Sequence, residues 1–514
     1  MLVQRFLEDS ARQYPAKTAL VCGGQRLTYQ EIEAAANRLA HALQALGLQR
    51  GDRVVIFLDN SPEVAISIFA ALKAGGVFVI VNPTAKIDKL AYILNNCRAR
   101  VVITQASKVR PLTEEQPPLP HLSAIVVARG EIEAPPGSIP CLTLDGLLAP
   151  HEADTSRPDN SCVDVDLAAL IYTSGSTGNP KGVMLTHLNM VAAATSITTY
   201  LENQPDDIIL NVLPLSFDYG LYQLLMAFKI GGTLVLERSF AYPYAVIETL
   251  RRENVTGFPL VPTILAILLQ LDLSKFSFPA LRYVSNTGAA LPTPHIARLR
   301  QLFPHVRIYS MYGLTECKRV AYLPPDQIDR RPNSVGKAMP NVEAYVVDEH
   351  GRVPPGTIGE LVVRGSNVMK GYWEMPEATS KMLQPDPVSG ETVLYTGDQF
   401  WMDEEGYLYF VGRTDNIIKT RGEKVSPKEV ENVLYALESV AEAVVIGVPD
   451  PVLGQAIKAV VALKAGAQLT AQDIQRHCAR HRDVERAQAG PQRNPQRHGR
   501  RRAYMGGNAG AFAP

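Results

Sequence analysis

Closely spaced hydroxyl residues and glycines lie between Tyr172 and Pro180, and Lys181 follows them. Such a segment offers a polyanion many short hydrogen-bond donors, a backbone that can approach closely and one mobile cation. An apolar run from Ala168 to Tyr172 predicts a strand that leads into the segment, and Pro180-Lys181-Gly182 gives it a defined end. We therefore predict a loop that binds a nucleotide triphosphate; composition alone would also suit a plain Ser/Gly linker.

The loop lacks the other common phosphate-binding and nucleophile motifs. The Walker A motif requires Gly-Lys followed by Ser or Thr, whereas Gly336-Lys337 is followed by Ala338. Neither G-x-G-x-x-G nor the hydrolase motif G-x-S-x-G occurs in the loop. The hydroxyls of Ser174 and Ser176 are therefore predicted to be hydrogen-bond donors rather than nucleophiles.

An acidic residue between two aromatic ones follows the strand predicted from Ile208 to Leu213. The segment is Phe217-Asp218-Tyr219, and a helix is expected from Leu221 to Phe228. Asp218 is either a pocket residue or the N-cap of that helix, and the sequence favours neither.

Two more predicted strands, Leu281–Val284 and Ile308–Met311, end in small, polar or aromatic residues, which is where open α/β sheets build their sites. The residues after the first strand are Asn286, Thr287 and Gly288, and those after the second are Tyr312, Thr315 and Glu316. A tyrosine ring can stack on a base, a threonine hydroxyl can contact phosphate and a carboxylate is a hard ligand for Mg²⁺. A strand-end turn with a cap is the simpler alternative.

Two short motifs follow, Thr396-Gly397-Asp398 and Gly412-Arg413-Thr414-Asp415. Alone, each is typical of a loop. In this order after the hydroxyl-rich loop and Tyr-Gly-x-Thr-Glu, however, they resemble the adenylate-forming superfamily of acyl-CoA synthetases, amino-acid adenylation domains and luciferases. The resemblance extends from about Leu27 to about His477.

The resemblance implies an α/β protein with a large, multi-subdomain N-terminal adenylate-forming domain over residues 1–414. A small α+β C-terminal lid over 415–478 would rotate between two half-reactions and is expected to be incomplete. Residues 479–514 contain eight arginines and no leucine or isoleucine, which is typical of a disordered tail.

The implied reaction is the ATP-dependent activation of a carboxylic acid to an acyl-adenylate with release of pyrophosphate, followed by transfer to a thiol. Cofactors would be ATP and Mg²⁺, and the acceptor would be CoA or the phosphopantetheine of a separate carrier protein. The residues implied to hold the outer phosphates are Thr173, Ser174, Gly175, Ser176, Thr177, Gly178 and Lys181. The other implied contacts are Tyr312 and Gly288 with the nucleotide, Thr315 with the α-phosphate, Glu316 with the metal, Asp398 and Arg413 with the ribose, and Gly422 with the pantetheine. The implied acid pocket consists of Phe217, Asp218, Tyr219, Asn286, Thr287 and Gly288, and the implied hinge is Asp415.

One family residue is missing. The family carries a catalytic lysine near the end of the lid, whereas no lysine follows Lys464. We expect weakened adenylation as a result. The tail is either a genuine basic extension or the product of a frameshift near Ala479.

The acid itself stays open between fatty, aryl and amino acids. In amino-acid-activating relatives an aspartate at the place of Asp218 binds the substrate's ammonium group. The alternatives are therefore a stand-alone amino-acid adenylating enzyme and a non-catalytic nucleotide or acyl-adenylate binder. Lys318-Arg319 beside Glu316 would bind an acidic substrate tail, or would be a solvated surface pair, which is the commoner case.

Composition agrees with a neutral, cytoplasmic enzyme. The chain has 514 residues, enough for two or more domains, and its 51 Lys and Arg balance 51 Asp and Glu, which gives no field to attract nucleic acid. Six scattered cysteines are predicted to be free thiols, and no apolar run is long enough to span a membrane.

Local patterns predict the elements that position these residues. Thr28 and Glu31 predict a capping box for a helix that ends at Gly47, and a second helix is expected over Pro62–Lys73. Buried strands alternate with these helices, which indicates a layered α/β domain. The Pro- and Glu-rich stretch 116–158 is expected to be a surface connection.

Overall fold

The computed structural model describes residues 1–114, 118–131, 139–173, 179–288, 291, 293–386, 388–414, 416–420, 423–450 and 454–478. The chain divides into two compact units, each with its own cluster of buried hydrophobic residues. The first consists of Met1–Leu291, Leu299–Ala344 and Val363–Tyr395, and the second of Pro292–Arg298, Tyr345–Val362 and the chain from Thr396 onward. The domain boundary between residues 414 and 415 stays a prediction.

An eight-stranded sheet of order β20-β9-β8-β4-β3-β5-β6-β7 belongs to the first unit. Its strands from β8 to β7 run parallel, whereas β9 and β20 are antiparallel at one edge. The strands are β3 (Arg53–Ile56), β4 (Val77–Ile80), β5 (Ala99–Gln105), β6 (Ala124–Arg129), β7 (Cys141–Thr143), β8 (Leu167–Thr173), β9 (Lys181–Thr186) and β20 (Gly371–Tyr372). They confirm the predicted strands before the hydroxyl-rich loop.

A nine-stranded sheet of order β16-β15-β14-β13-β12-β10-β11-β1-β2 also belongs to the first unit. Its strands are β1 (Thr18–Cys22), β2 (Gln25–Thr28), β10 (Ile208–Asn211), β11 (Thr233–Leu236), β12 (Gly257–Leu260), β13 (Tyr283–Asn286), β14 (Arg307–Tyr312), β15 (Ala321–Leu323) and β16 (Lys337–Ala338). The neighbouring strands β14, β13, β12, β10, β11 and β1 all run parallel. The carboxyl ends of β13 and β14 therefore lie next to each other.

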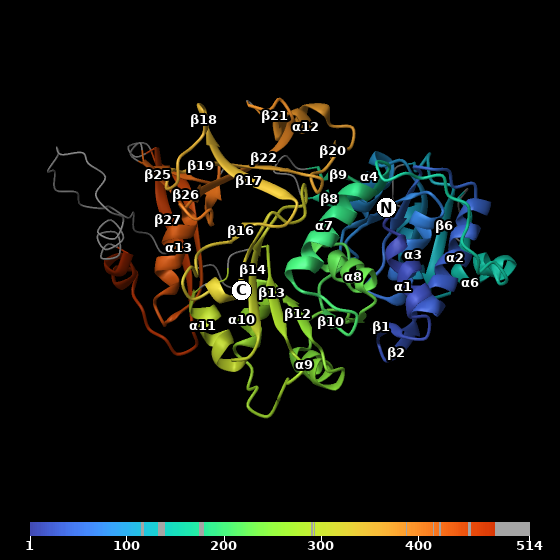
Figure 1. Ribbon diagram of the computed structural model, residues 1–514, viewed down its shortest axis with the longest axis horizontal. Helices are drawn as coiled ribbons and strands as arrows, with labels where there is room; N and C mark the ends of the chain where they lie inside the picture. The colour runs from blue at the N-terminus through green and yellow to red at the C-terminus, as the bar shows by residue number, and fades with distance from the viewer. Residues whose placement is uncertain are drawn as a thin grey trace. The chain divides into compact units, whose positions relative to one another are not determined.

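Helices cover both sheets, and two lie between them. Figure 1 shows α7 (His187–Tyr200) and α8 (Asp218–Ile230) in this middle layer, where α7 packs on β8 and β9, and α8 packs on β10 and β11. The other helices are α1 (Arg5–Gln13), α2 (Tyr29–Ala45), α3 (Pro62–Lys73), α4 (Ile87–Asn96), α5 (Ala106–Glu114), α6 (Leu144–Leu148), α9 (Pro243–Arg252), α10 (Pro262–Leu268), α11 (Thr293–Leu302), α12 (Pro376–Met382) and α13 (Pro427–Tyr435). No helix in the described ranges is both long and apolar enough to cross a membrane.

Local sequence signals set the helix ends. The side chain of Thr28 accepts from the backbone N–H of Glu31, whose side chain accepts from Thr28, so the predicted capping box is confirmed. Gly47 follows the C-cap with φ of +85°, a conformation that favours glycine. The expected Pro62–Lys73 helix is confirmed with the same bounds.

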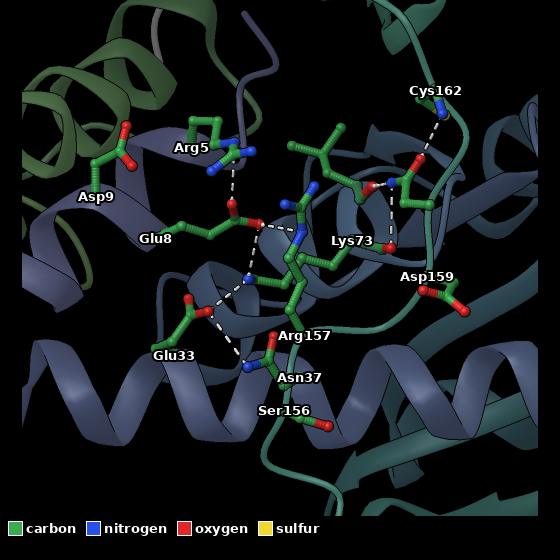
Figure 2. Close-up of polar contacts among 12 residues, drawn as sticks. Arg5, Glu8, Asp9, Glu33, Asn37, Lys73, Ser156, Arg157, Asp159 and Cys162 are labelled. Carbon is green, nitrogen blue, oxygen red and sulfur yellow. Dashed lines mark hydrogen bonds and ion pairs between the residues drawn. The ribbon is translucent and has the colours of Figure 1, made fainter.

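A buried polar cluster joins the first three helices (Figure 2). The Nζ atom of Lys73 at the end of α3 lies 2.7 Å from Glu33 on α2 and 3.2 Å from Glu8 on α1, and the Lys73 side chain is fully buried. Arg5 and Arg157 each contact Glu8 at 3.3 Å. Because a buried charge is stable only when paired, this cluster fixes the three helices to one another.

Two further sheets complete the described chain. A six-stranded sheet contains β17 (Val342–Asp348), β18 (Gly351–Arg352), β19 (Gly359–Gly365), β21 (Leu383–Pro385), β22 (Thr392–Met402) and β23 (Leu408–Arg413). In the second unit, a four-stranded sheet contains β24 (Ile418–Thr420), β25 (Glu423–Val425), β26 (Val440–Asp450) and β27 (Gly454–Leu463).

The stretch 116–158 is not merely a surface connection, so that prediction is wrong. It contributes β6 and β7, and Ala124, Ile125 and Val126 of β6 are buried in the core. The flanking Pro and Glu residues dominate the composition of the stretch and conceal this short apolar run. All six cysteines are free thiols, as predicted.

Candidate active site

The strands β8 and β9 form an antiparallel pair that brackets the hydroxyl-rich loop. Thr173, the last residue of β8, lies opposite Lys181, the first residue of β9. The predicted anchoring strand is thus confirmed, and it places the two ends of the loop side by side. The predicted phosphate contacts Ser174, Gly175, Ser176, Thr177 and Gly178 lie outside the described residues.

Lys181 and Glu316 converge on one tyrosine. The Nζ atom of Lys181 lies 5.4 Å from the centre of the Tyr372 ring, and the Tyr372 hydroxyl donates to Glu316 Oε1 at 2.7 Å. A cation over an aromatic face and a phenol donating to a carboxylate are both favourable contacts. The structure therefore brings the predicted phosphate cation and the predicted metal ligand to the same place, with Tyr372 between them.

A tight loop after β14 presents Thr315 and Glu316. At Gly313 a Cβ atom would lie 2.2 Å from the Lys318 carbonyl oxygen, so only glycine permits this approach. The backbone N–H of Lys318 donates to Leu314 O at 2.7 Å and closes the turn.

The side chain of Asn367 binds the backbone of this loop. Its side-chain Nδ2 donates to the carbonyl oxygens of Cys317 at 2.7 Å and Arg319 at 2.9 Å, and the residue is buried. The backbone of Met369 donates to the Glu316 carbonyl at 2.7 Å. Backbone contacts on both sides of Glu316 thus fix where its carboxylate points.

The carboxyl ends of β13 and β14 form one edge, as parallel neighbours must. Asn286 lies opposite Ser310, which places Thr287 and Gly288 beside Tyr312. Asn286 and Thr287 are buried, whereas Tyr312 is half-buried. Both predicted strands are confirmed, although each includes one or two of the residues that we placed after it.

The start of α8 bears on one of the two alternatives for Asp218, the N-cap. Phe217 is the N-cap residue and its side chain makes no capping hydrogen bond, while Asp218 is the first residue of the helix. Asp218 is therefore not the N-cap. The hydroxyl of Tyr219 lies 2.8 Å from the Ser285 carbonyl oxygen and 2.7 Å from Ser285 Oγ, which fastens this helix start to the end of β13.

Asp218 is paired with a buried lysine. Lys318 Nζ lies 2.9 Å from Asp218 Oδ1 and donates to the Thr315 carbonyl at 2.9 Å, and its side chain is completely buried. Arg319 is 4% exposed; its Nη1 lies 3.9 Å from Asp218 Oδ2, and its guanidinium lies 4.7 Å from the centre of the Tyr219 ring. A solvated surface pair at 318–319 is thereby excluded.

Asp398 and Arg413 lie opposite each other in the second unit. They are cross-strand partners in β22 and β23, and Arg413 Nε is 3.5 Å from Asp398 Oδ1. Thr396-Gly397-Asp398 and Gly412-Arg413 thus lie in paired strands rather than in plain loops. The backbone N–H of Gly397 donates to Glu360 Oε1 at 2.8 Å, and burial raises the pKa of Glu360. The predicted hinge Asp415 and the predicted pantetheine contact Gly422 lie outside the described residues.

In the first unit, burial disfavours ionisation of two neutral groups near Asp218 and Glu316. It raises the pKa of Tyr219 and of the Cys317 thiol, in each case because desolvation penalises the anion. The tyrosine therefore acts as a neutral hydrogen-bonding group, and Cys317 is an inert core residue.

Sequence reasoning missed Tyr372, Asn367 and Glu360. Each acts on a predicted site residue that is distant in sequence, so no local pattern identifies it. The segment Gly371-Tyr372-Trp373, a glycine before two aromatics, is the one signal that could have drawn attention to Tyr372.

Comparison with known families gives the arrangement its context. The family model "AMP-binding enzyme" matches residues 7–373, and the model "AMP-binding enzyme C-terminal domain" matches residues 429–495. The chain belongs to the AMP-binding enzyme family. This confirms the superfamily resemblance and the adenylate-forming α/β fold with a large N-terminal and a small C-terminal domain.

Relatives of this AMP-binding enzyme come from two kinds of protein. It is 32% identical to the long-chain-fatty-acid–CoA ligase of Bacillus subtilis over 92% of this chain and 87% of the relative. It is also 32% identical to tyrocidine synthase 2 of Brevibacillus parabrevis over 87% of this chain but only 12% of that much longer protein. Among solved structures, ATP-bound MatB from Rhodopseudomonas palustris matches with a TM-score of 0.80 and 30% identity, covering 93% of this chain and 92% of that one. These similarities support an adenylate-forming, ATP-using enzyme of the acyl-CoA ligase type.

Proposed function

We propose that the chain activates a carboxylic acid with Mg·ATP and transfers the acyl group to the thiol of CoA or of a separate carrier protein. In the first step a carboxylate oxygen bonds to the α-phosphorus while the bond to the bridging oxygen breaks, releasing pyrophosphate. In the second step the thiolate sulfur bonds to the acyl carbon and AMP leaves. The observation that carries the proposal is the convergence of Lys181 and Glu316 on Tyr372 beside the ends of the loop.

The outer phosphates are assigned to the loop between β8 and β9. Thr173 and Lys181 flank it on paired strands, so a cation stands at its exit. Phosphoryl transfer depends on positioning and on charge neutralisation, which this combination of hydroxyls, glycines and lysine would provide. Thr315, in the tight loop after β14, is proposed to contact the α-phosphate.

Glu316 is proposed to hold Mg²⁺. Glu316 is half-buried. Among the described residues, only the Tyr372 hydroxyl donates a hydrogen bond to its carboxylate, at Oε1. Magnesium is commonly bound by one or two carboxylates plus substrate phosphates and water, so one carboxylate beside a phosphate loop fits this ion. When bound, Mg²⁺ would neutralise the charge that develops on the phosphate oxygens.

The nucleoside contacts follow from the family motifs. Tyr312 is proposed to stack on adenine beside Gly288, and Asp398 to accept from the ribose hydroxyls with help from Arg413. The ion pair between Asp398 and Arg413 supports this assignment because it orients the carboxylate. Gly422 is proposed to contact the pantetheine, and Asp415 is proposed to be the hinge. The proposed location of the protein is the cytoplasm.

Among the acids, the geometry disfavours an α-amino acid. Asp218, which would bind a substrate ammonium, is already neutralised by Lys318 at 2.9 Å. A second ammonium at that carboxylate would be repelled by the lysine and by Arg319. An acid without an ammonium group at this position is therefore the proposed substrate, with Phe217, Tyr219, Asn286 and Thr287 lining its site.

We further propose that adenylation is slow, because no lysine follows Lys464. Losing one preorganised donor to a developing charge lowers the rate by about 10²- to 10³-fold. Normal acid-dependent exchange of pyrophosphate into ATP would contradict this.

Trapping of activated acids by hydroxylamine across fatty, aryl, dicarboxylic and amino acids tests the function. We expect hydroxamate and pyrophosphate from one class of acid that lacks an α-amino group. Product from amino acids alone would favour the amino-acid adenylating enzyme, and ATP binding without product from any acid would favour the non-catalytic binder.

A further inference from the structure

The buried cluster of Asp218, Lys318 and Arg319 carries an excess positive charge. Two cations face one carboxylate, and within the described chain Asp218 is the only carboxylate within ion-pair distance of either cation. The side chain of Lys318 is completely buried, with no surface accessible to solvent. A buried cation without a counter-ion costs several kcal/mol, so such a charge excess is normally balanced by an anion.

Of the two cations, Lys318 is satisfied and Arg319 is not. Lys318 Nζ contacts Asp218 and donates to Thr315 O. Arg319 uses Nη1 to donate to the Lys318 carbonyl at 2.7 Å, but its buried Nε has no hydrogen-bond partner among the described residues. A buried guanidinium N–H without an acceptor is unusual, since buried polar groups are almost always paired.

A second buried donor, on α8, is also without a hydrogen-bond partner among the described residues. Tyr222 lies one turn after Asp218 on α8, and its buried hydroxyl has no hydrogen-bond partner among the described residues. The charges of Asp218 and Arg319 both act on the pKa of Tyr222, which burial raises well above its ordinary value, so the hydroxyl stays protonated. A guanidinium N–H and a phenol O–H are complementary to a carboxylate.

Two alternatives account for less of this pattern. Cation–π contact with Tyr219 at 4.7 Å stabilises the guanidinium face, but it leaves the in-plane Nε proton without an acceptor. Glu316 is the nearest acidic residue in sequence, but it lies beyond ion-pair distance of both cations and accepts from Tyr372. Neither neutralises Arg319.

We propose that Arg319 binds a second carboxylate of the acid substrate, remote from the carboxylate that is activated. The proposal deepens the proposed function and rests on it. Lys318 keeps Asp218 occupied, so that Arg319 is the group left to select the acid. The preferred substrate is accordingly a dicarboxylic acid rather than a simple fatty acid or an amino acid.

The test compares dicarboxylic acids from three to eight carbons, and the benzene dicarboxylic acids, each with its monomethyl ester. The ester keeps the shape of the acid and removes one charge. Binding is measured by calorimetry and turnover by pyrophosphate release, for the wild type, Arg319→Met, Arg319→Lys and the control Arg307→Gln. Arg307 is an exposed residue of β14 that pairs with Glu202.

We expect the wild type and R307Q to bind at least one diacid about 30-fold more tightly than its ester, as for a buried charge pair. R319M should lose this difference because it binds the diacid more weakly, whereas R319K should retain part of the difference. Equal binding of diacid and ester by the wild type, or a preference that survives in R319M, would overturn the proposal. If R319M does not fold, the wild-type and R319K comparisons decide.

The two hypotheses fail separately. An Arg319-dependent preference for a diacid, with no pyrophosphate from any acid, would overturn the proposed function and leave this inference standing. Pyrophosphate release from simple monocarboxylic acids that R319M does not alter would do the reverse.

Discussion

Lys318 Nζ lies 2.9 Å from Asp218 Oδ1, in a position where neither side chain is more than 8% exposed. A lysine of the chain itself thus neutralises the carboxylate that the sequence alone offered to a substrate ammonium. This contact joins the loop after β14 to the start of α8, and the cluster of Asp218, Lys318 and Arg319 carries a net positive charge.

We expect Asp218→Asn to lower the free energy of unfolding by about 3–5 kcal/mol, because it leaves two buried cations without a counter-ion. Adding Lys318→Met should recover most of this loss, since the charge excess returns to its original value. Urea unfolding of both single variants and the double variant measures the coupling. Additive effects would show that the two residues do not stabilise each other.

Tyr372→Phe should weaken the response to Mg²⁺ about 10-fold, because it removes the hydroxyl that orients Glu316. The measurement is pyrophosphate release, or ATP binding by calorimetry, as a function of Mg²⁺ concentration. Tyr242→Phe is the matched control, since Tyr242 is 80% exposed. An unchanged Mg²⁺ dependence in Y372F would argue against Glu316 as the metal ligand.

Lys73→Met should destabilise the first unit by about 3 kcal/mol, because Glu8 and Glu33 lose their shared cation. Arg12→Met removes an exposed ion pair with Asp9 instead and should cost less than about 1 kcal/mol. Urea midpoints of the two variants provide the comparison, and equal shifts would contradict a special role for the buried cluster.

Acid should destabilise the protein through His187. Its Nδ1 accepts from the backbone N–H of Val3 at 3.1 Å, and burial lowers its pKa from 6.5 to about 4 despite the nearby Asp166 and Asp164. The folded state therefore favours the neutral ring, so this stabilisation is complete above pH 6.5 and is lost as the pH falls towards 4, by about 3 kcal/mol in total.

His187→Gln keeps a neutral acceptor at that position and should flatten the stability profile between pH 6.5 and 4. Unfolding curves for both proteins at pH 7, 6, 5 and 4 provide the measurement. Parallel profiles would assign the acid sensitivity to other groups.

Helix ends were predictable because their causes are local. The Thr28–Glu31 box and the limits of Pro62–Lys73 depend on residues within one turn, and both are as predicted. Strand positions were predictable to within a few residues, since each apolar run is bounded by turn residues. β6 was missed because its short apolar run is embedded in a stretch whose composition is typical of a loop.

The candidate acid site was only partly predictable because its electrostatics are non-local. The sequence identifies Asp218 and Lys318 as charged residues, but their contact depends on the docking of α8 against the loop after β14. Both side chains are buried in the folded chain, which no local sequence pattern predicts. In the same way, the partner of Glu316 lies on β20, far from it in sequence.

The pairing of β1 with β11 has a consequence for synthesis on the ribosome. Leu20 lies opposite Leu234, so the first strand of the chain is made about 200 residues before its parallel neighbour. At about 5–20 residues per second, the nascent hairpin waits roughly 10–40 s with an open edge. During that interval it is a template for wrong strand pairing, and slower translation would lengthen the exposure.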